Sequence, residues 1–242
     1  MDRRLYQEMY ELEEKHWWFV GRRRVLCDSI KRKVGKTEKI LDIGCGTGIN
    51  AKWLGELGKE VYGVEISDEA IEFAEKRTPN LKVIQGEFPN IEINDRFDLI
   101  TLFDVLEHFE DDSDALKKIG ALLNPGGYAV FSVPAFSFLW SEHDELAHHK
   151  RRYTARELRE KLVQAGFYPV KITYFNTFLF LPILLFRFMR KTFGLRGGKT
   201  DFFMAPAPIN QVLAQLFGAE RFLFRFVDFP FGVSLLAIAK KG

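Results

Sequence analysis

Short apolar runs alternate with amphipathic segments along most of this chain. From Lys39 onward, glycine, proline or polar residues bound apolar runs that have the length and composition of strands. We expect seven strands, over residues 39–43, 60–66, 81–85, 97–103, 128–134, 170–175 and 233–239. Helix-like segments separate most of them, which is the order of βαβ units. The pattern therefore predicts an α/β protein whose mostly parallel sheet has helices on both faces.

Local signals indicate where several helices begin and end. The helix after the first strand is expected to stop at Gly58, because glycine commonly follows the last helical turn. Ser67 is an expected N-cap for the next helix. Thr154 and Glu157 have the spacing of a capping box, and Gly166 marks the end of the helix that they open.

Two regions lie outside the predicted core of residues 37–175 and 232–242. Residues 1–36 are expected to form N-terminal lid helices. Residues 176–231 are too long for a simple loop and hold more than half of the 24 phenylalanines, and basic residues outnumber acidic ones there. Three interpretations of this hydrophobic, basic insertion remain open: a cap over the acceptor site, a peripheral membrane contact and a homodimer interface. Its longest apolar run, 178–186, is far shorter than the ~20 residues of a transmembrane helix.

Composition narrows the class of protein. The 242 residues are 47% hydrophobic and 28% charged, with a formal net charge of +2, which is typical of a globular domain and not of a polybasic nucleic-acid binder. Charges interrupt the first apolar stretches, so we expect no signal peptide and a cytoplasmic protein. The two cysteines, Cys27 and Cys45, predict neither a disulfide framework nor a metal site. We therefore expect no nucleic-acid partner and no bound metal.

A glycine-rich loop follows the first predicted strand. Asp42 ends that strand, and Gly44, Cys45 and Gly46 come next, where the backbone must turn sharply toward a helix and can approach a ligand closely. A glycine loop alone also occurs for structural reasons. Glu65 ends the second strand about 20 residues later, which is the usual offset of an acid that binds ribose hydroxyls.

The loop after the third strand adds a second set of candidates. Gly86, Glu87 and Phe88 would offer a carboxylate to an exocyclic amine and an aromatic face to a purine. An ordinary polar loop would have the same composition.

Together these stretches resemble the class I S-adenosylmethionine-dependent methyltransferases. The fourth-strand segment FDLITLFDVLEHF and the turn LLNPGG match that family in order and position. The resemblance implies a Rossmann-like fold with S-adenosylmethionine as cofactor and S-adenosylhomocysteine as product. It also implies roles for particular residues: the 42–46 loop, Cys45 included, would hold the methionine part, Glu65 the ribose, and Ile66, Gly86, Glu87 and Phe88 the adenine. Phe103 and Asp104 complete the cofactor contacts, although family members more often carry aspartate where Glu87 stands.

Histidines are the candidate bases for an acceptor hydroxyl. His108 follows the fourth strand at the edge where ligands bind in such sheets, and quinone-biosynthesis O-methyltransferases carry the same Leu-Glu-His. A histidine that merely packs at a helix start is an equally weighted interpretation. His143 and His148, in the polar loop after the fifth strand, are secondary candidates.

The aromatic and basic segment HWWFVGRRR precedes the sheet. In similar methyltransferases this region covers the cofactor. Trp17 or Trp18, with Trp18 preferred, is therefore expected over the site, and one of Arg22 to Arg24, with Arg23 preferred, at the cofactor carboxylate. A helix end that docks on the domain would explain the same residues.

The sequence thus favours O-methylation of a small or amphiphilic acceptor, such as a lipid, an isoprenoid or quinone, or a lipid-linked sugar. The alternatives are N-methylation of a small amine and a non-catalytic cofactor-fold binding protein at a membrane. A nicotinamide oxidoreductase is disfavoured because the loop lacks the Gly-x-Gly-x-x-Gly spacing.

Overall fold

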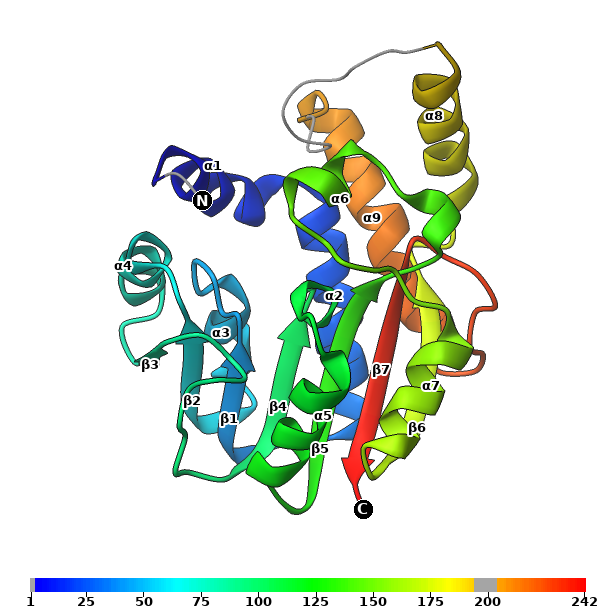
Figure 1. Cartoon of the computed structure of the whole chain (residues 1–242). Helices are drawn as coiled ribbons and strands as arrows, with labels where there is room; N and C mark the ends of the chain where they lie inside the picture. Colours follow the sequence, from blue (N-terminus) through cyan, green and yellow to red (C-terminus); the bar gives the residue numbers. More distant parts are fainter. Residues whose placement is uncertain (1–2, 194–203) are drawn as a thin grey trace.

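The computed structural model describes residues 3–193 and 204–242, which form a single seven-stranded sheet between two helical layers (Figure 1). The strand order is β3-β2-β1-β4-β5-β7-β6. Neighbours from β3 through β5 are parallel, and β7 is antiparallel to both β5 and β6. The strands are β1 (Thr37–Ile43), β2 (Gly58–Glu65), β3 (Lys82–Gln85), β4 (Phe97–Phe103), β5 (Leu123–Pro134), β6 (Phe167–Phe175) and β7 (Ser234–Lys241). The predicted fold class and mostly parallel sheet are confirmed.

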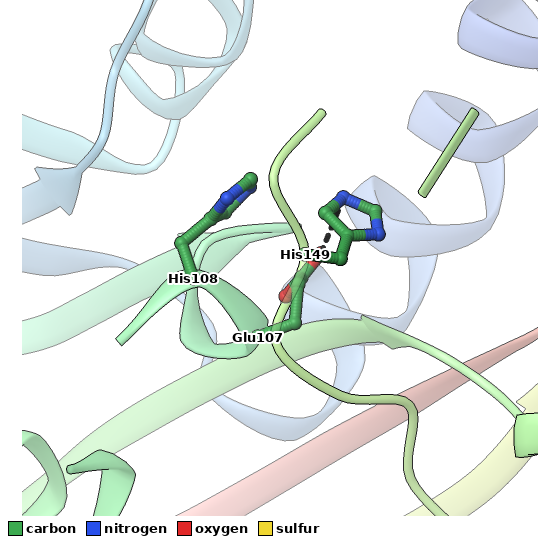
Figure 2. A group of neighbouring side chains, drawn as sticks. All are labelled: Glu107, His108 and His149. Atoms are coloured by element: carbon green, nitrogen blue, oxygen red, sulfur yellow. Dashed lines mark ion pairs between the residues drawn. The ribbon is translucent and has the colours of Figure 1, made fainter. Parts of the chain in front are cut away.

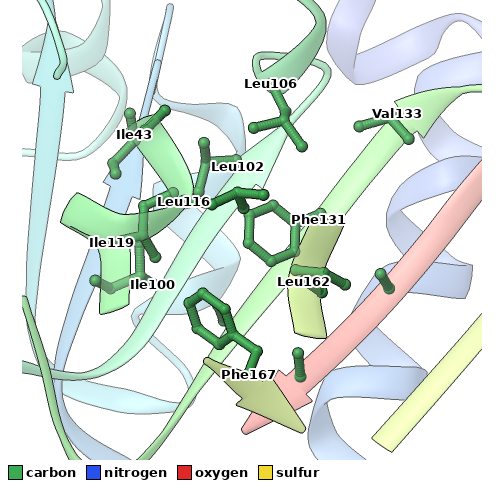
Figure 3. Packing of buried hydrophobic residues seen from close by; sticks show 14 of the residues in the cluster. Ile43, Ile100, Leu102, Leu106, Leu116, Ile119, Phe131, Val133, Leu162 and Phe167 are labelled. Atoms are coloured by element: carbon green, nitrogen blue, oxygen red, sulfur yellow. The ribbon is translucent and has the colours of Figure 1, made fainter. Parts of the chain in front are cut away.

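Helices cover both faces of the sheet. The helices are α1 (Arg3–Lys15), α2 (Trp17–Lys33), α3 (Ile49–Leu54), α4 (Asp68–Arg77), α5 (Asp112–Leu122), α6 (Glu142–Leu146), α7 (Ala155–Gln164), α8 (Phe180–Phe193) and α9 (Ala207–Leu223), with short 3-10 turns η1 (Leu106–His108) and η2 (Ser137–Leu139). On one face, α5 and α7 pack against β4 and β5 through residues such as Leu116, Phe131 and Leu162 (Figure 3). On the other face, the core includes buried residues of α2, α3 and α9.

The sheet topology fixes where a ligand can bind. Strand β1 lies between β2 and β4. The order of the strands along the chain reverses between β1 and β4. At such a switch point the loops after neighbouring strands turn apart and leave a crevice at the carboxyl ends. The loops that follow β1, β2 and β4 therefore meet at one edge of the sheet.

Helix signals in the sequence are confirmed at Ser67, at Thr154 with Glu157, and at Gly166, which follows the end of α7 with a φ of 86°, and are wrong at Gly58. The Ser67 side chain accepts a hydrogen bond from the N–H of Ala70, and Thr154 with Glu157 forms the capping box that opens α7. The helix after the glycine loop, however, ends at Leu54 and does not continue to the predicted stop at Gly58. Gly58 instead begins β2. Glycine is needed at this position because a Cβ would lie only 2.6 Å from the Ile40 side chain on the neighbouring strand.

The segments predicted to lie outside the core contribute to it. In α2, Val25, Leu26 and Ile30 are fully buried against the sheet, and Phe217 of α9 is buried in the same cluster. Helix α8 is different, since many of its apolar side chains are exposed. The middle of the predicted insertion, residues 194–203, lies outside the described residues. Within the described ranges, no helix has both the length and the apolar character needed to cross a bilayer.

Candidate active site

The glycine loop after β1 has the backbone of a ligand cradle. Gly44 and Gly46 have φ values of 69° and 53°, in the left-handed region that side chains disfavour. At Gly44 an added Cβ would lie 2.5 Å from Val105, so that position is closed by the fold. At Gly46 nothing lies within 4 Å of the added Cβ, so the loop there faces open space. A ligand can therefore approach the backbone at Gly46.

Two buried charged groups beside the loop have atoms without partners. Asp42 accepts a hydrogen bond from Thr101 Oγ1 at 2.6 Å, while its other oxygen, Oδ2, has no hydrogen-bond partner. Burial raises the pKa of Asp42 to about 7. Arg22 pairs with Asp104 at 2.8 Å, yet its Nε is buried and unpartnered. An unpaired acceptor and an unpaired donor at one sheet edge fit the ammonium and carboxylate of an amino acid, such as the methionine part of S-adenosylmethionine.

Glu65 is held firmly at the end of β2. Its Oε2 accepts from the N–H of Gly46 at 3.0 Å, and its Oε1 accepts from Ile66 and Ser67 at 2.9 and 3.1 Å. A carboxylate has about four lone-pair positions, and these three bonds leave one, on Oε2, that can accept a hydrogen bond from a ribose hydroxyl. Ile66 is 60% exposed beside it and can cover one face of an adenine ring.

Replacing Glu65 with alanine is expected to weaken S-adenosylhomocysteine binding by about tenfold or more, since hydrogen bonds to a charged group contribute about 1.5–3 kcal/mol each. Isothermal titration calorimetry measures this. Glu60→Ala, an exposed carboxylate near the other end of β2 that pairs with Lys82, is the matched control. Equal affinities in the two variants would refute the ribose assignment.

The adenine end of the site differs from the prediction at one position. Phe88 is buried against Phe109, with ring centroids 5.9 Å apart, and belongs to the core beneath α5. Its predicted role as the purine-facing ring is therefore corrected, because that face is already covered by protein. Glu87 is exposed next to it, and Gly86 is required because a Cβ would lie 2.4 Å from Ile91.

Other predicted cofactor residues have roles set by packing. Cys45 is buried with its Sγ against Gly63, and burial raises the pKa of its thiol, so it acts as a small apolar residue. Phe103 is buried between Trp53 and Arg22. Both residues belong to the same buried hydrophobic cluster next to the glycine loop.

The lid segment gives a second correction. Arg23 donates to the carbonyl of Glu13 and points toward α1, whereas Arg22 reaches Asp104 at the sheet edge. The arginine at this edge of the sheet is therefore Arg22, and its contact with the cofactor stays a prediction. Trp18 packs against Phe217 of α9, with centroids 5.5 Å apart, instead of covering the glycine loop. The hydrophobic docking interpretation describes Trp18 better.

A cluster of three titratable side chains lies at the carboxyl end of β4 (Figure 2). Glu107 is fully buried, and neither of its carboxylate oxygens has a hydrogen-bond partner. Its pKa is raised well above the ordinary range by burial and by the neighbouring charge of Asp104. His149 Nε2 lies 3.8 Å from Glu107 Oε1, and the rings of His108 and His149 are 4.8 Å apart. The potential ligand atoms of the three lie within 4.8 Å of one another, and the absence of a metal stays a prediction.

His149 is oriented by a buried carboxylate. Its Nδ1 lies 2.9 Å from Asp144 Oδ1, and Asp144 is also held by Arg152 through two hydrogen bonds of 2.8 Å. Burial works to raise the pKa of Asp144, but the hydrogen bonds from His149 and Arg152 outweigh it, and the pKa is well below its usual value. An ionised carboxylate only accepts, so Nδ1 of His149 must carry the proton. Its Nε2 is left with a free lone pair when the ring is neutral.

The predicted histidines are only partly brought together. His108 lies in the cluster, but burial and the nearby His149 lower its pKa to about 4, which makes it a weak base. The His143 ring lies 5.9 Å from that of His149, and His148 is exposed in a left-handed turn. His149, which the sequence interpretation left out, is hydrogen-bonded to the buried carboxylate of Asp144.

The fold and the site define a class I S-adenosylmethionine-dependent methyltransferase: a doubly wound sheet, a glycine cradle at its switch point and a carboxylate, Glu65, at the end of the next strand that accepts a hydrogen bond from the cradle. A family model described as a methyltransferase domain matches residues 19–172. The chain belongs to that family.

Known proteins agree on the fold. A ubiquinone biosynthesis O-methyltransferase of Albidiferax ferrireducens is 33% identical over 103 residues, 40% of this chain and 41% of that protein. A probable S-adenosylmethionine-dependent methyltransferase of Mycolicibacterium smegmatis is 26% identical over 64% of this chain and 61% of its own length. These matches span less than two thirds of either relative. The N-methyltransferase NodS of Bradyrhizobium japonicum, solved with S-adenosylhomocysteine, has a TM-score of 0.58 at 17% identity, covering 91% of this chain and 86% of NodS.

Proposed function

We propose that this chain transfers the methyl group of S-adenosylmethionine to a hydroxyl group of a small amphiphilic acceptor. The observation that carries the proposal is the Asp144–His149 pair, which lies at the same sheet edge as Arg22, Asp104 and the glycine loop. A hydroxyl acceptor needs a base to take its proton, whereas a neutral amine does not.

The pair is suited to remove that proton. When bound, S-adenosylmethionine would supply an electrophilic methyl group, and its product, S-adenosylhomocysteine, is a neutral thioether. His149 accepts the hydroxyl proton at Nε2, and Asp144 stabilises the resulting imidazolium through Nδ1. Arg152 keeps Asp144 ionised and in place. The proton then passes to solvent, so charge and atoms balance over the turnover.

An apolar rim beside the site supports an amphiphilic acceptor. Leu139 of η2, Phe180 of α8 and Val233 form a small buried cluster, and Phe138 and Leu181 next to it are 65% and 62% exposed. Such a surface favours an acceptor that carries an alkyl or isoprenoid chain. Contact of this rim with a bilayer, or with a second copy of the chain, stays a prediction.

N-methylation is the second candidate, and the fold shared with NodS is compatible with it. A base with a carboxylate partner would then be superfluous, so the His149 arrangement favours oxygen. A non-catalytic binding protein would bind the cofactor but transfer no methyl group to any acceptor.

The first test is calorimetric binding of S-adenosylmethionine and S-adenosylhomocysteine, with NAD as the control ligand. We expect saturable binding of the two sulfur nucleosides and none of NAD. Transfer of a radiolabelled methyl group is then measured to alkyl catechols, to matched alkyl amines and to lipid-linked sugars. Faster transfer to the catechols than to the amines supports the proposal, and faster transfer to the amines would overturn the choice of oxygen.

A further inference from the structure

Arg77 is a buried cation that lies outside the contacts described above. It is the last residue of α4, and its side chain is 1% exposed. Its Nη1 donates to Glu13 Oε2 of α1 at 2.6 Å, and to the hydroxyl and carbonyl oxygens of Thr47 at 2.5 and 3.1 Å. Its Nη2 donates to the carbonyl of Tyr10, whose ring centroid lies 3.9 Å from the guanidinium carbon. One side chain thus joins α1, α4 and the glycine loop.

Helix α1 contacts two segments of the proposed cofactor site, the loop after β2 near its start and the glycine loop near its end. Figure 1 shows α1 above α3 and α4, off the end of the sheet that carries the glycine loop. Near its start, Tyr6 is hydrogen-bonded to the Ser67 side chain, beside the ribose acid Glu65. Near its end, Glu13 is bonded to Arg77 and to Thr47 Oγ1. The helix is therefore fastened at both ends to segments that contact the cofactor.

Moving α1 away would leave Arg77 poorly paired. The guanidinium would lose the Glu13 carboxylate, the Tyr10 carbonyl and the Tyr10 ring, and keep only Thr47. Breaking a buried ion pair is costly because the remaining charge is left without compensation. Thr47 would lose its bond to Glu13 in the same step. The position of α1 and the conformation of the glycine loop are thus linked through Arg77.

We propose that Arg77 is a positioning residue that latches α1 over the bound cofactor and sets how fast the product S-adenosylhomocysteine leaves. The inference rests on the cofactor site of the proposed function. The proposed function assigns the methionine end of the ligand to the glycine loop, and α1 contacts that loop through Glu13 and Thr47, so we expect α1 to move away when the ligand exchanges. Each lift breaks the Glu13–Arg77 pair, and this pair slows the release.

The test measures the rate constant for dissociation of S-adenosylhomocysteine from the full chain by stopped-flow tryptophan fluorescence. Glu13→Gln and Arg77→Met are each expected to raise it by about tenfold or more, within the fivefold to 150-fold range of typical site coupling. The double variant should be no faster than Arg77→Met alone. Arg77→Lys should not restore slow release, because an ammonium cannot reproduce the guanidinium fork.

Glu14→Gln is the matched control. Glu14 is the neighbouring carboxylate on α1, about half exposed and 3.9 Å from Arg77 Nε, and its substitution should leave the rate constant unchanged. Amide hydrogen exchange gives a second measurement: the ligand should slow exchange in α1 of the wild type but not of Glu13→Gln. If Arg77→Met does not fold, Glu13→Gln decides, because Glu13 lies on a helix outside the sheet core.

The outcomes separate the two proposals. Wild-type release rates and wild-type protection of α1 in a folded Glu13→Gln variant would overturn the latch alone. A wild-type chain that does not bind S-adenosylhomocysteine would overturn the cofactor site, and the latch with it. No acceptor is needed, so the result does not depend on which group is methylated.

Discussion

Replacing His149 with glutamine is expected to lower kcat with a hydroxyl acceptor by about 10²–10⁴-fold, the usual contribution of a positioned base. Glutamine can still donate to Asp144, so the buried carboxylate keeps a partner, but it cannot accept the proton. The dissociation constant of S-adenosylhomocysteine should stay within about twofold of the wild type, because the His149 side chain contacts Glu107 and Asp144, which are not part of the glycine loop. Steady-state methyl transfer and calorimetry together measure the two effects.

Two histidine variants are the controls for this result. His148→Gln changes the adjacent, exposed residue and should leave kcat within about twofold. His108→Gln should cost less than His149→Gln, because a histidine with a pKa of about 4 takes a proton poorly at neutral pH. A large loss in His108→Gln with an active His149→Gln would return the base assignment to His108. Small losses in both would favour an amine acceptor.

The sequence was sufficient to predict those features of the fold that depend on residues close together in the chain. Alternation of apolar runs with amphipathic segments predicts the strands and their order of connection, because parallel strands buried on both faces are apolar throughout. The position of Glu65 beside the glycine loop could be predicted because it depends only on the end of β2 and the distance from that loop, while its role at the ribose stays a prediction. Ser67 and Thr154 follow from capping chemistry within one turn.

The choice between Arg22 and Arg23 shows a signal that was present but not used. Phe19, Arg22, Val25 and Leu26 recur at helical spacing, and all four are buried in α2. That periodicity directs Arg22 toward the sheet and turns Arg23 about 100° away, toward α1. A helical phase drawn through the apolar residues would have selected Arg22.

Other features could not be predicted, because they depend on contacts between distant segments. The pairing of His149 with Asp144 is local in the sequence. The contact between His149 and Glu107, however, joins two loops about 40 residues apart, and no rule of sequence spacing predicts such a contact. Phe88 follows a strand whether its ring faces a ligand or the core, so sequence cannot separate the two. The packing of Phe217 against α2 likewise depends on Gly21, where a Cβ would lie 2.5 Å from the Phe217 ring.

Replacing Arg152 with methionine is expected to lower the free energy of unfolding by about 3–5 kcal/mol, because it leaves the fully buried Asp144 carboxylate without its cation. Urea denaturation at neutral pH measures the change. Arg156→Met is the matched control: Arg156 pairs with Glu160 on the surface of α7, where its side chain is 87% exposed, and such solvent-exposed pairs contribute little to stability.

The Asp144–Arg152 pair also predicts how the free energy of unfolding depends on pH. In the wild type the pKa of Asp144 lies below its unfolded value of about 4, so its contribution is complete above that pH and is lost as the pH falls. Methionine at 152 removes one of the hydrogen-bonded charges that lower the pKa, so acid unfolding should begin at a higher pH. Equal unfolding free energies for Arg152→Met and Arg156→Met would mean that Asp144 does not depend on Arg152. Asp144 would then be held for its contact with His149 by the capping Ser141.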